Sequence, residues 1–173
     1  MKWPRFWKFI FGGTQYSTRF KKGEKFEAYS EKFFPSTSFD LVHRTSDYRT
    51  NRKRFIESSL KPDFLFRDKV TRRLFYVECK FRASMINGRI ECCTSHQQLA
   101  RNFSYHHKIP VYLLVGLGGR PNQPIYLFFI PLDEITETQL SPSVINQFRV
   151  SIRPPLVSSL IWRKAIVSTN RFK

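Results

Sequence analysis

The pattern of hydrophobic and polar residues predicts a β-hairpin in the first half of the chain. Residues 62–66 and 74–80 are dominated by aromatic and β-branched side chains, which favour strands. Residues 67–73, which lie between them, are polar and typical of a turn. The two segments are therefore expected to run antiparallel.

The second strand of this hairpin has two different faces, because side chains alternate along a strand. The apolar face is expected to join the core and consists of Phe75, Val77, Cys79 and Phe81. The opposite face carries Glu78 and Lys80 side by side. A hairpin would also bring Asp63 close to this pair.

Hydrophobic periodicity predicts further elements on both sides of the hairpin. The expected elements are helices over residues 23–34, 94–108 and 141–148, and strands over residues 39–44, 89–93, 110–116 and 125–131. The intervening segments are interpreted as a linker (12–22), a long basic loop (44–61) and a flexible glycine-rich turn (116–122). This order predicts an α/β fold in which helices flank a mixed central sheet.

Asp63, Glu78 and Lys80 together supply the groups that a metal-dependent phosphodiesterase needs. Two neighbouring carboxylates repel each other, and a hard cation such as Mg²⁺ accepts one or two carboxylates as ligands. Such an ion activates a bound water and stabilises charge on a phosphate, and a lysine beside it can orient that water. The plainer alternative is an acid at a strand start and an exposed Glu–Lys pair on a solvent-facing strand.

Pro62-Asp63 followed by Glu78-Cys79-Lys80 resembles the PD-(D/E)xK motif of the restriction-endonuclease-like nucleases. That superfamily includes type II restriction enzymes, Holliday junction resolvases and RecB-type nuclease domains. The proline and aspartate open one strand, and the E-x-K triplet ends the next apolar strand, as the motif requires.

The resemblance covers about residues 23–135 and implies a restriction-endonuclease-like core with Mg²⁺ as cofactor, for which Mn²⁺ would substitute. It implies that Asp63 and Glu78 bind the metal and that Lys80 positions or activates the attacking water. The reaction implied is hydrolysis of phosphodiester bonds in DNA by a metal-dependent endonuclease.

The resemblance extends to two residues on the flanking helices. Members of the superfamily commonly carry a glutamate on the first helix in a G-x-x-x-E pattern, which Gly23 and Glu27 match. Glu27 is therefore expected to be a third metal ligand, although acids on a helix are more often a solvated face. Several relatives place a glutamine on the helix after the hairpin, and Gln98 is expected to orient the site in the same way.

The charge of the chain favours a polyanionic partner. The 30 lysines and arginines outnumber the 13 acids and give a net charge of +17. Nucleic acid is the simplest such partner, and an anionic membrane surface is the alternative. DNA is expected because the relatives mostly cut DNA, and RNA remains open. The expected nucleic-acid-binding residues are Arg49, Arg52, Lys53, Arg54, Lys61 and Arg82.

The cysteines and residues 3–11 indicate where in the cell the protein is expected. The three cysteines, Cys79, Cys92 and Cys93, indicate free thiols in a reducing compartment, so a cytoplasmic location is expected. The apolar residues 3–11 are too short to span a bilayer, and no transmembrane segment is expected. A homodimer is expected only by analogy with resolvases and restriction enzymes.

The sequence therefore divides into three parts and leaves three functional hypotheses. The parts are a basic aromatic N-terminal arm (1–22), a nuclease-like domain (23–135) and a C-terminal extension (136–173). The first hypothesis is the metal-dependent DNA endonuclease. The second is a catalytically inactive nucleic-acid-binding module of the same fold. The third, a membrane-surface protein, gives no role to the acids and the lysine of the hairpin.

Overall fold

A mixed six-stranded sheet forms the centre of the structure, a computed structural model that describes residues 13–45, 61–92, 108–135, 137, 139–159 and 161–162. The strands of this sheet are β1 (Phe39–Arg44), β2 (Phe64–Asp68), β3 (Leu74–Arg82), β5 (Val111–Arg120), β6 (Gln123–Pro131) and β8 (Arg149–Val150). They lie in the order β1-β2-β3-β5-β6-β8, and every neighbouring pair is antiparallel except β3 and β5, which are parallel.

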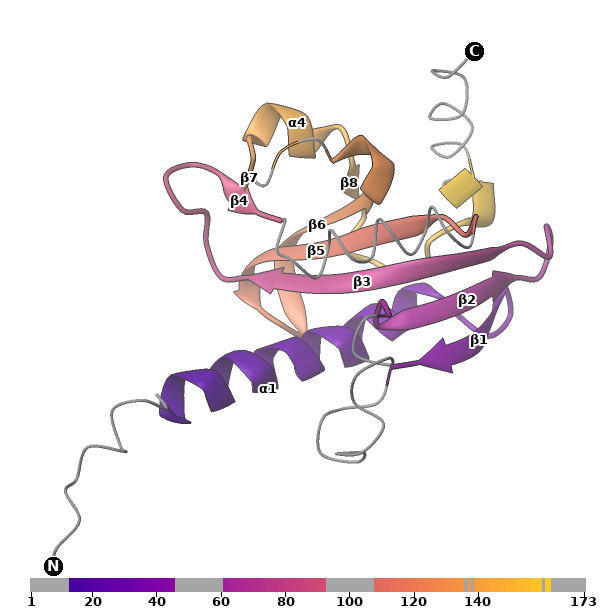
Figure 1. Cartoon of the computed structure of the whole chain (residues 1–173), viewed down its shortest axis with the longest axis horizontal. Helices are drawn as coiled ribbons and strands as arrows, with labels where there is room; N and C mark the ends of the chain where they lie inside the picture. Colours follow the sequence, from indigo (N-terminus) through magenta and orange to yellow (C-terminus); the bar gives the residue numbers. More distant parts are fainter. Residues whose placement is uncertain are drawn as a thin grey trace, which may run out of the picture.

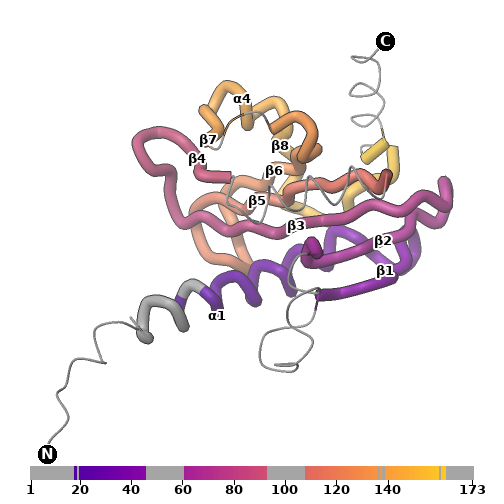
Figure 2. The backbone as a smooth tube through the Cα atoms, in the orientation of Figure 1, coloured from indigo at the N-terminus to yellow at the C-terminus, as the bar shows by residue number. Residues whose placement is uncertain are grey.

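The remaining elements cover the two faces of this sheet (Figure 1). They are α1 (Gly13–Ser30), the 3₁₀ helices η2 (Glu31–Phe33) and η3 (Leu132–Glu134), α4 (Pro142–Asn146), and a two-stranded sheet of β4 (Ile90–Glu91) and β7 (Gln139–Leu140). The backbone trace shows α1 on one side of the sheet and α4 on the other (Figure 2).

Each face of the sheet carries its own hydrophobic core. The first core, on the α1 side, includes Phe26 and Phe33 together with the strand residues Val77 and Cys79. The second core lies on the α4 side and includes Tyr76 of β3. Because successive residues of β3 enter different cores, this strand is buried on both faces, as expected for a strand with a parallel neighbour.

The helix α1 packs closely on the sheet at Gly116. Phe26 is fully buried and lies over Gly116 of β5, where an added Cβ would come within 2.4 Å of the phenyl ring. Because only a glycine leaves room for this ring, the contact fixes where α1 crosses the sheet. It thereby also fixes the position of the next residue, Glu27.

The segment after residue 135 contributes to the first core. Leu156, Ile161 and Trp162 are buried there, and the Tyr112 hydroxyl donates a hydrogen bond to the Ile161 carbonyl at 2.9 Å. Trp162 also donates to the buried carboxylate of Asp68 at the end of β2. The C-terminal segment is thus packed against the sheet that bears the hairpin.

The predicted strands are confirmed, and two other predictions are wrong. Residues 12–22 were expected to form a linker, but α1 begins at Gly13, because no proline interrupts this stretch and Gly23 is tolerated inside a helix. Residues 116–122 were expected to form a turn, but β5 continues to Arg120. There Gly118 and Gly119 adopt positive φ angles within the strand pair, so the turn itself is shorter. The predicted helix over residues 94–108 lies almost entirely outside the described residues.

Candidate active site

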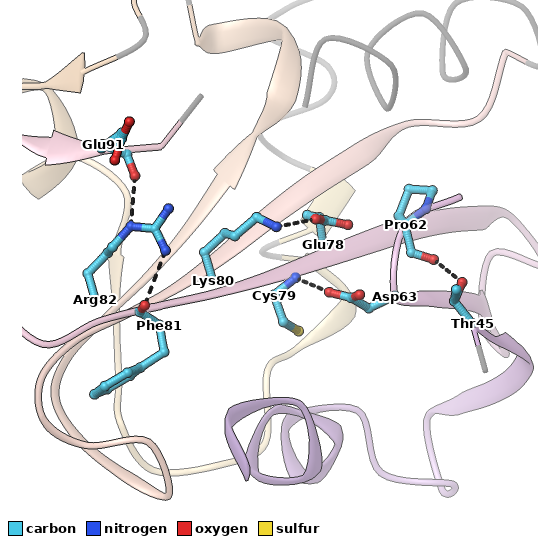
Figure 3. A network of polar contacts seen from close by, with 9 residues as sticks. All are labelled: Thr45, Pro62, Asp63, Glu78, Cys79, Lys80, Phe81, Arg82 and Glu91. Atoms are coloured by element: carbon cyan, nitrogen blue, oxygen red, sulfur yellow. Dashed lines mark hydrogen bonds and ion pairs between the residues drawn. The ribbon is translucent and has the colours of Figure 1, made fainter. Parts of the chain in front are cut away.

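The first part of the candidate site lies where β2 begins beside β3. The antiparallel register pairs Phe64 with Val77, so Asp63, one residue before β2, stands beside the Glu78–Cys79 region of β3. The Asp63 carboxylate accepts a hydrogen bond from the Cys79 backbone N–H at 2.7 Å (Figure 3). Residues that are far apart in the sequence are therefore locked together by a main-chain contact.

Thr45, just after β1, holds the backbone of this aspartate. Its hydroxyl donates to the Pro62 carbonyl at 2.8 Å, and its N–H donates to the Asp63 carbonyl at 2.9 Å (Figure 3). Sequence reasoning missed Thr45, because a threonine that holds a backbone 17 positions away leaves no local pattern. This brace keeps the Pro-Asp dipeptide against the sheet.

Glu78 and Lys80 form an ion pair on the face of β3 opposite Cys79. The Lys80 Nζ lies 2.5 Å from Glu78 Oε1, and only 22% and 9% of the two side chains are exposed. On β5, the apolar residues Leu113 and Val115 pair with these two positions. The pair is therefore largely buried, which differs from the solvent-facing Glu–Lys pair of the plainer alternative.

The charges around Asp63 disfavour its ionised form. Burial raises the pKa of the Asp63 carboxyl well above its ordinary value, and the negative charges of Glu78 and Glu27 raise it further. The ammonium of Lys80 and the Cys79 N–H act in the opposite direction but do not outweigh these effects. A site that gathers negative charge in this way would be stabilised by a cation.

The same charges and burial shift the pKa values of Lys80 and Cys79. Burial lowers the pKa of the Lys80 ammonium, but the carboxylates of Glu78 and Asp63 outweigh burial and raise it, so Lys80 is a cation at neutral pH. Burial and the charge of Asp63 raise the pKa of the Cys79 thiol well above its usual range. This thiol is therefore neutral and not suited to act as a nucleophile.

Glu27 reaches the site from α1. It is half-buried, and its negative charge raises the pKa of Asp63. Within the described ranges, no group of three or more His, Cys, Asp or Glu side chains is gathered closely enough to hold a metal ion. Asp63 and Glu78 supply two carboxylates from adjacent strands, which suits Mg²⁺, because this ion commonly takes one or two carboxylates and keeps several waters.

The other predicted site residues fall into two groups. Lys61 is exposed immediately before Pro62, and Arg82 is half-buried at the end of β3. Arg82 donates from Nε to the Glu91 carbonyl at 3.0 Å and from Nη1 to the Phe81 carbonyl at 3.2 Å, so its guanidinium holds the segment that follows β3 (Figure 3). The predictions outside the described residues are Gln98, Arg49, Arg52, Lys53 and Arg54.

Comparisons with known proteins show the fold. No protein-family model and no curated protein matches the sequence. The structure is similar to the 1.6 Å structure of Hjc, a Holliday junction resolvase from the hyperthermophilic archaeon Archaeoglobus fulgidus, with a TM-score of 0.50 and 17% sequence identity. The match covers 76% of this chain and 92% of that one.

The chain has the restriction-endonuclease-like α/β fold of the PD-(D/E)xK nucleases. The predicted fold class is therefore confirmed, and the Pro-Asp dipeptide just before β2 and the Glu-Cys-Lys segment of β3, which resemble that motif, lie beside each other. No helix in the described part of the chain has both the length and the apolar composition needed to cross a bilayer.

Proposed function

We propose that this protein is a metal-dependent DNA endonuclease of the PD-(D/E)xK type. The observation that carries the proposal is the junction of β2 and β3, where the Asp63 carboxylate is fixed on the Cys79 N–H beside the buried Glu78–Lys80 ion pair. A largely buried cluster of acids is costly unless something neutralises it. Core packing alone does not require such a cluster, whereas metal-assisted phosphodiester hydrolysis uses carboxylates as metal ligands.

Each residue of the candidate site has a separate proposed role. Asp63 and Glu78 hold the metal, and Glu27 acts as the outer, supporting carboxylate. Bound there, Mg²⁺ would lower the pKa of a water and stabilise negative charge on the phosphate. Lys80, a buried cation, orients the attacking water and neutralises charge that develops on the phosphate oxygens. Gln98 helps to orient the same water.

DNA is the proposed substrate for two reasons. The net charge of +17 favours a phosphate backbone, and Lys61 presents an exposed cation directly beside the Pro-Asp dipeptide. The structurally similar Hjc is itself a Holliday junction resolvase, so this fold accommodates cleavage of branched DNA in that protein. The basic residues Arg49, Arg52, Lys53 and Arg54 are proposed to bind the DNA backbone, which would make affinity strongly salt-dependent.

The test is cleavage of supercoiled plasmid and of a four-way junction, with Mg²⁺, with Mn²⁺ and with chelator. We expect cleavage with either metal and none with chelator. Lys80→Met keeps the length of the side chain but removes its charge, and it should reduce the cleavage rate at least about 100-fold, as is typical for loss of one group that stabilises transition-state charge. Glu31→Gln is the matched control, because Glu31 is an acid just after α1 that pairs with Arg44 at the surface.

Two results would count against the proposal. If Lys80→Met cleaves as fast as the unmodified chain, any nuclease activity observed belongs to a contaminant or to another site. If the unmodified chain binds DNA in a salt-sensitive manner but does not cleave any form with either metal, the inactive nucleic-acid-binding module is the better description.

A further inference from the structure

The segment between β3 and β4 forms a tight and rigid turn. The Ile86 N–H donates to the Arg89 carbonyl at 2.9 Å, and the Arg89 N–H donates back to the Ile86 carbonyl at 2.9 Å. Asn87 and Gly88 between them have φ angles of 51° and 70°. Two successive positive φ angles closed by a reciprocal pair of hydrogen bonds are what a type I′ turn requires, so the tip is preformed.

The base of this turn is anchored to the body of the protein. Arg82 donates to the Glu91 carbonyl across the base, and Ile90 is buried in the second core. Arg89 forms an ion pair with Glu137 at 3.2 Å. These contacts tie both arms of the turn, which stands out at the edge of the molecule in Figure 1.

The tip exposes two large apolar side chains. Met85 and Ile86 are 36% and 59% exposed, so they add little to either core. Two arginines flank these side chains: Arg82, whose guanidinium donates to backbone carbonyls, and Arg89, which is half exposed and paired with Glu137. An apolar tip flanked by arginines matches the chemistry of DNA, in which phosphates surround a stack of flat bases with apolar faces.

We propose that this tip, Met85-Ile86, is a wedge that enters DNA between bases at a point where stacking is already broken, such as a branch, nick or bulge. Isoleucine and methionine are among the side chains that proteins insert between base steps, and inserting them is least costly where the bases are already unstacked. The inference rests on the proposed function and deepens it, because it names distorted DNA as the substrate class.

The position of the tip relative to the candidate site fits this role. Ile86 follows Lys80 by six residues on the same strand and turn, so the two Cα atoms are at most about 20 Å apart. One turn of B-form DNA is about 34 Å long. The tip and the candidate site therefore lie within one helical turn of a duplex from each other.

The test measures base unstacking directly, without cleavage. A four-way junction with 2-aminopurine beside the branch is titrated with the full chain in chelator, and an uninterrupted duplex of the same sequence is the reference. The unmodified chain should raise 2-aminopurine fluorescence on the junction. The double variant Met85→Ser/Ile86→Ser should abolish this rise and weaken junction binding about tenfold, with duplex binding changed less than about twofold.

The matched control is Val70→Ser in the turn between β2 and β3, at the opposite end of β3. Val70 is 80% exposed, so this change removes an even more accessible apolar side chain from a turn at the other end of the same strand. It should leave the fluorescence rise and the junction affinity unchanged. Thermal denaturation of all three proteins verifies that they are equally folded.

The outcomes separate the wedge from the nuclease proposal. If the double variant unstacks the branch and binds the junction like the unmodified chain, the wedge is refuted even if the protein cleaves DNA. If the chain never cleaves, but the fluorescence rise depends on Met85 and Ile86, the wedge stands and the nuclease proposal fails. Equal losses on junction and duplex would also overturn the wedge, because they would indicate general backbone contact.

Discussion

The two ends of β2 carry a half-buried aspartate, Asp63, and a fully buried one, Asp68, with opposite environments. Asp68, at the end of the strand, accepts hydrogen bonds at both carboxylate oxygens: Oδ1 from the N–H groups of Val70 and Thr71, and Oδ2 from Ser158 and Trp162. Asp63, just before the strand, accepts from the Cys79 N–H and faces two other acids.

The pKa values of these two carboxyl groups move in opposite directions. Burial raises the pKa of Asp68, but the hydrogen bonds from Ser158, Trp162, Thr71 and Val70 outweigh it, and the pKa falls below its ordinary value. Burial, Glu78 and Glu27 raise the pKa of Asp63 well above that value. The strand therefore ends in a carboxylate whose charge is stabilised, whereas it begins with one whose charge is destabilised.

This difference distinguishes an acid that the fold satisfies from one that it does not. A buried carboxylate that the fold satisfies by itself needs no further partner. A buried carboxylate held among other acids retains an unmet attraction for a cation. Perturbed acids of this second kind cluster at functional sites, which favours Asp63 and not Asp68 as part of the candidate site.

The largest expected effect follows from Asp63→Asn, which should separate activity from stability. Cleavage of the four-way junction with Mg²⁺ should fall at least about 100-fold, because the variant loses a proposed metal ligand. The melting temperature in chelator at pH 7 should rise by about 2–4 °C, because the variant removes an unfavourable buried charge.

The sign of this stability effect can be checked with pH. Because the folded pKa of Asp63 lies above the ordinary value of 3.8, the folded state binds the proton more tightly. Stability of the unmodified chain therefore falls as pH rises from 3.8 through the folded pKa, and the advantage of the variant should vanish below pH 3.8. Added Mg²⁺ should raise the melting temperature of the unmodified chain only. A variant that loses stability in chelator would contradict the comparison.

Asp68→Asn should lower stability and leave the chemistry intact. The amide group keeps the shape of the carboxylate but turns its NH₂ toward the donors that the carboxylate satisfies. We expect a loss of about 2–3 kcal/mol in the free energy of unfolding, measured by urea denaturation. The control is Asp40→Asn, because Asp40 is a half-exposed acid on β1 that pairs with Lys69 at the surface. A change below about 0.5 kcal/mol for Asp68→Asn would mean that its hydrogen bonds contribute little.

Lowering the pH should have a smaller effect, on the stability that the Asp68 carboxylate contributes. The folded pKa of Asp68 lies below 3.8, so its stabilisation is complete above pH 3.8 and is lost as pH falls through the folded pKa. The difference in unfolding free energy between the unmodified chain and Asp68→Asn should therefore be constant from pH 7 to about pH 4 and shrink at lower pH. Urea denaturation at a series of pH values measures it, and a difference that changes between pH 5 and 7 would assign the titration to another group.

The sequence was sufficient for the elements with strong local patterns. Alternating residues in the hairpin predicted β2, β3 and the faces of β3, and the Pro-Asp and E-x-K segments indicated the superfamily. Ser141 was expected to start a short helix with proline in its first turn, and the structure confirms it as the N-cap of α4.

What the sequence could not predict depends on contacts between distant segments. The continuation of β5 through Gly118 depends on pairing with β6, which overrides weak local preferences. Two donors to Asp68 come from Ser158 and Trp162, 90 and 94 positions away, so no local pattern shows that Asp68 is an acid satisfied by the fold. Only the surroundings, and not the residue type, separate the two acids.

The contact between Asp68 and Trp162 also has a consequence for biosynthesis. At a translation rate of about 5–20 residues per second, the ribosome needs roughly 5–20 s to travel the 94 positions between the two residues. During that interval the nascent hairpin lacks the tryptophan that will cover this part of its core. An emerging chain of this protein is therefore expected to expose aromatic surface for seconds, a period in which chaperones can bind it.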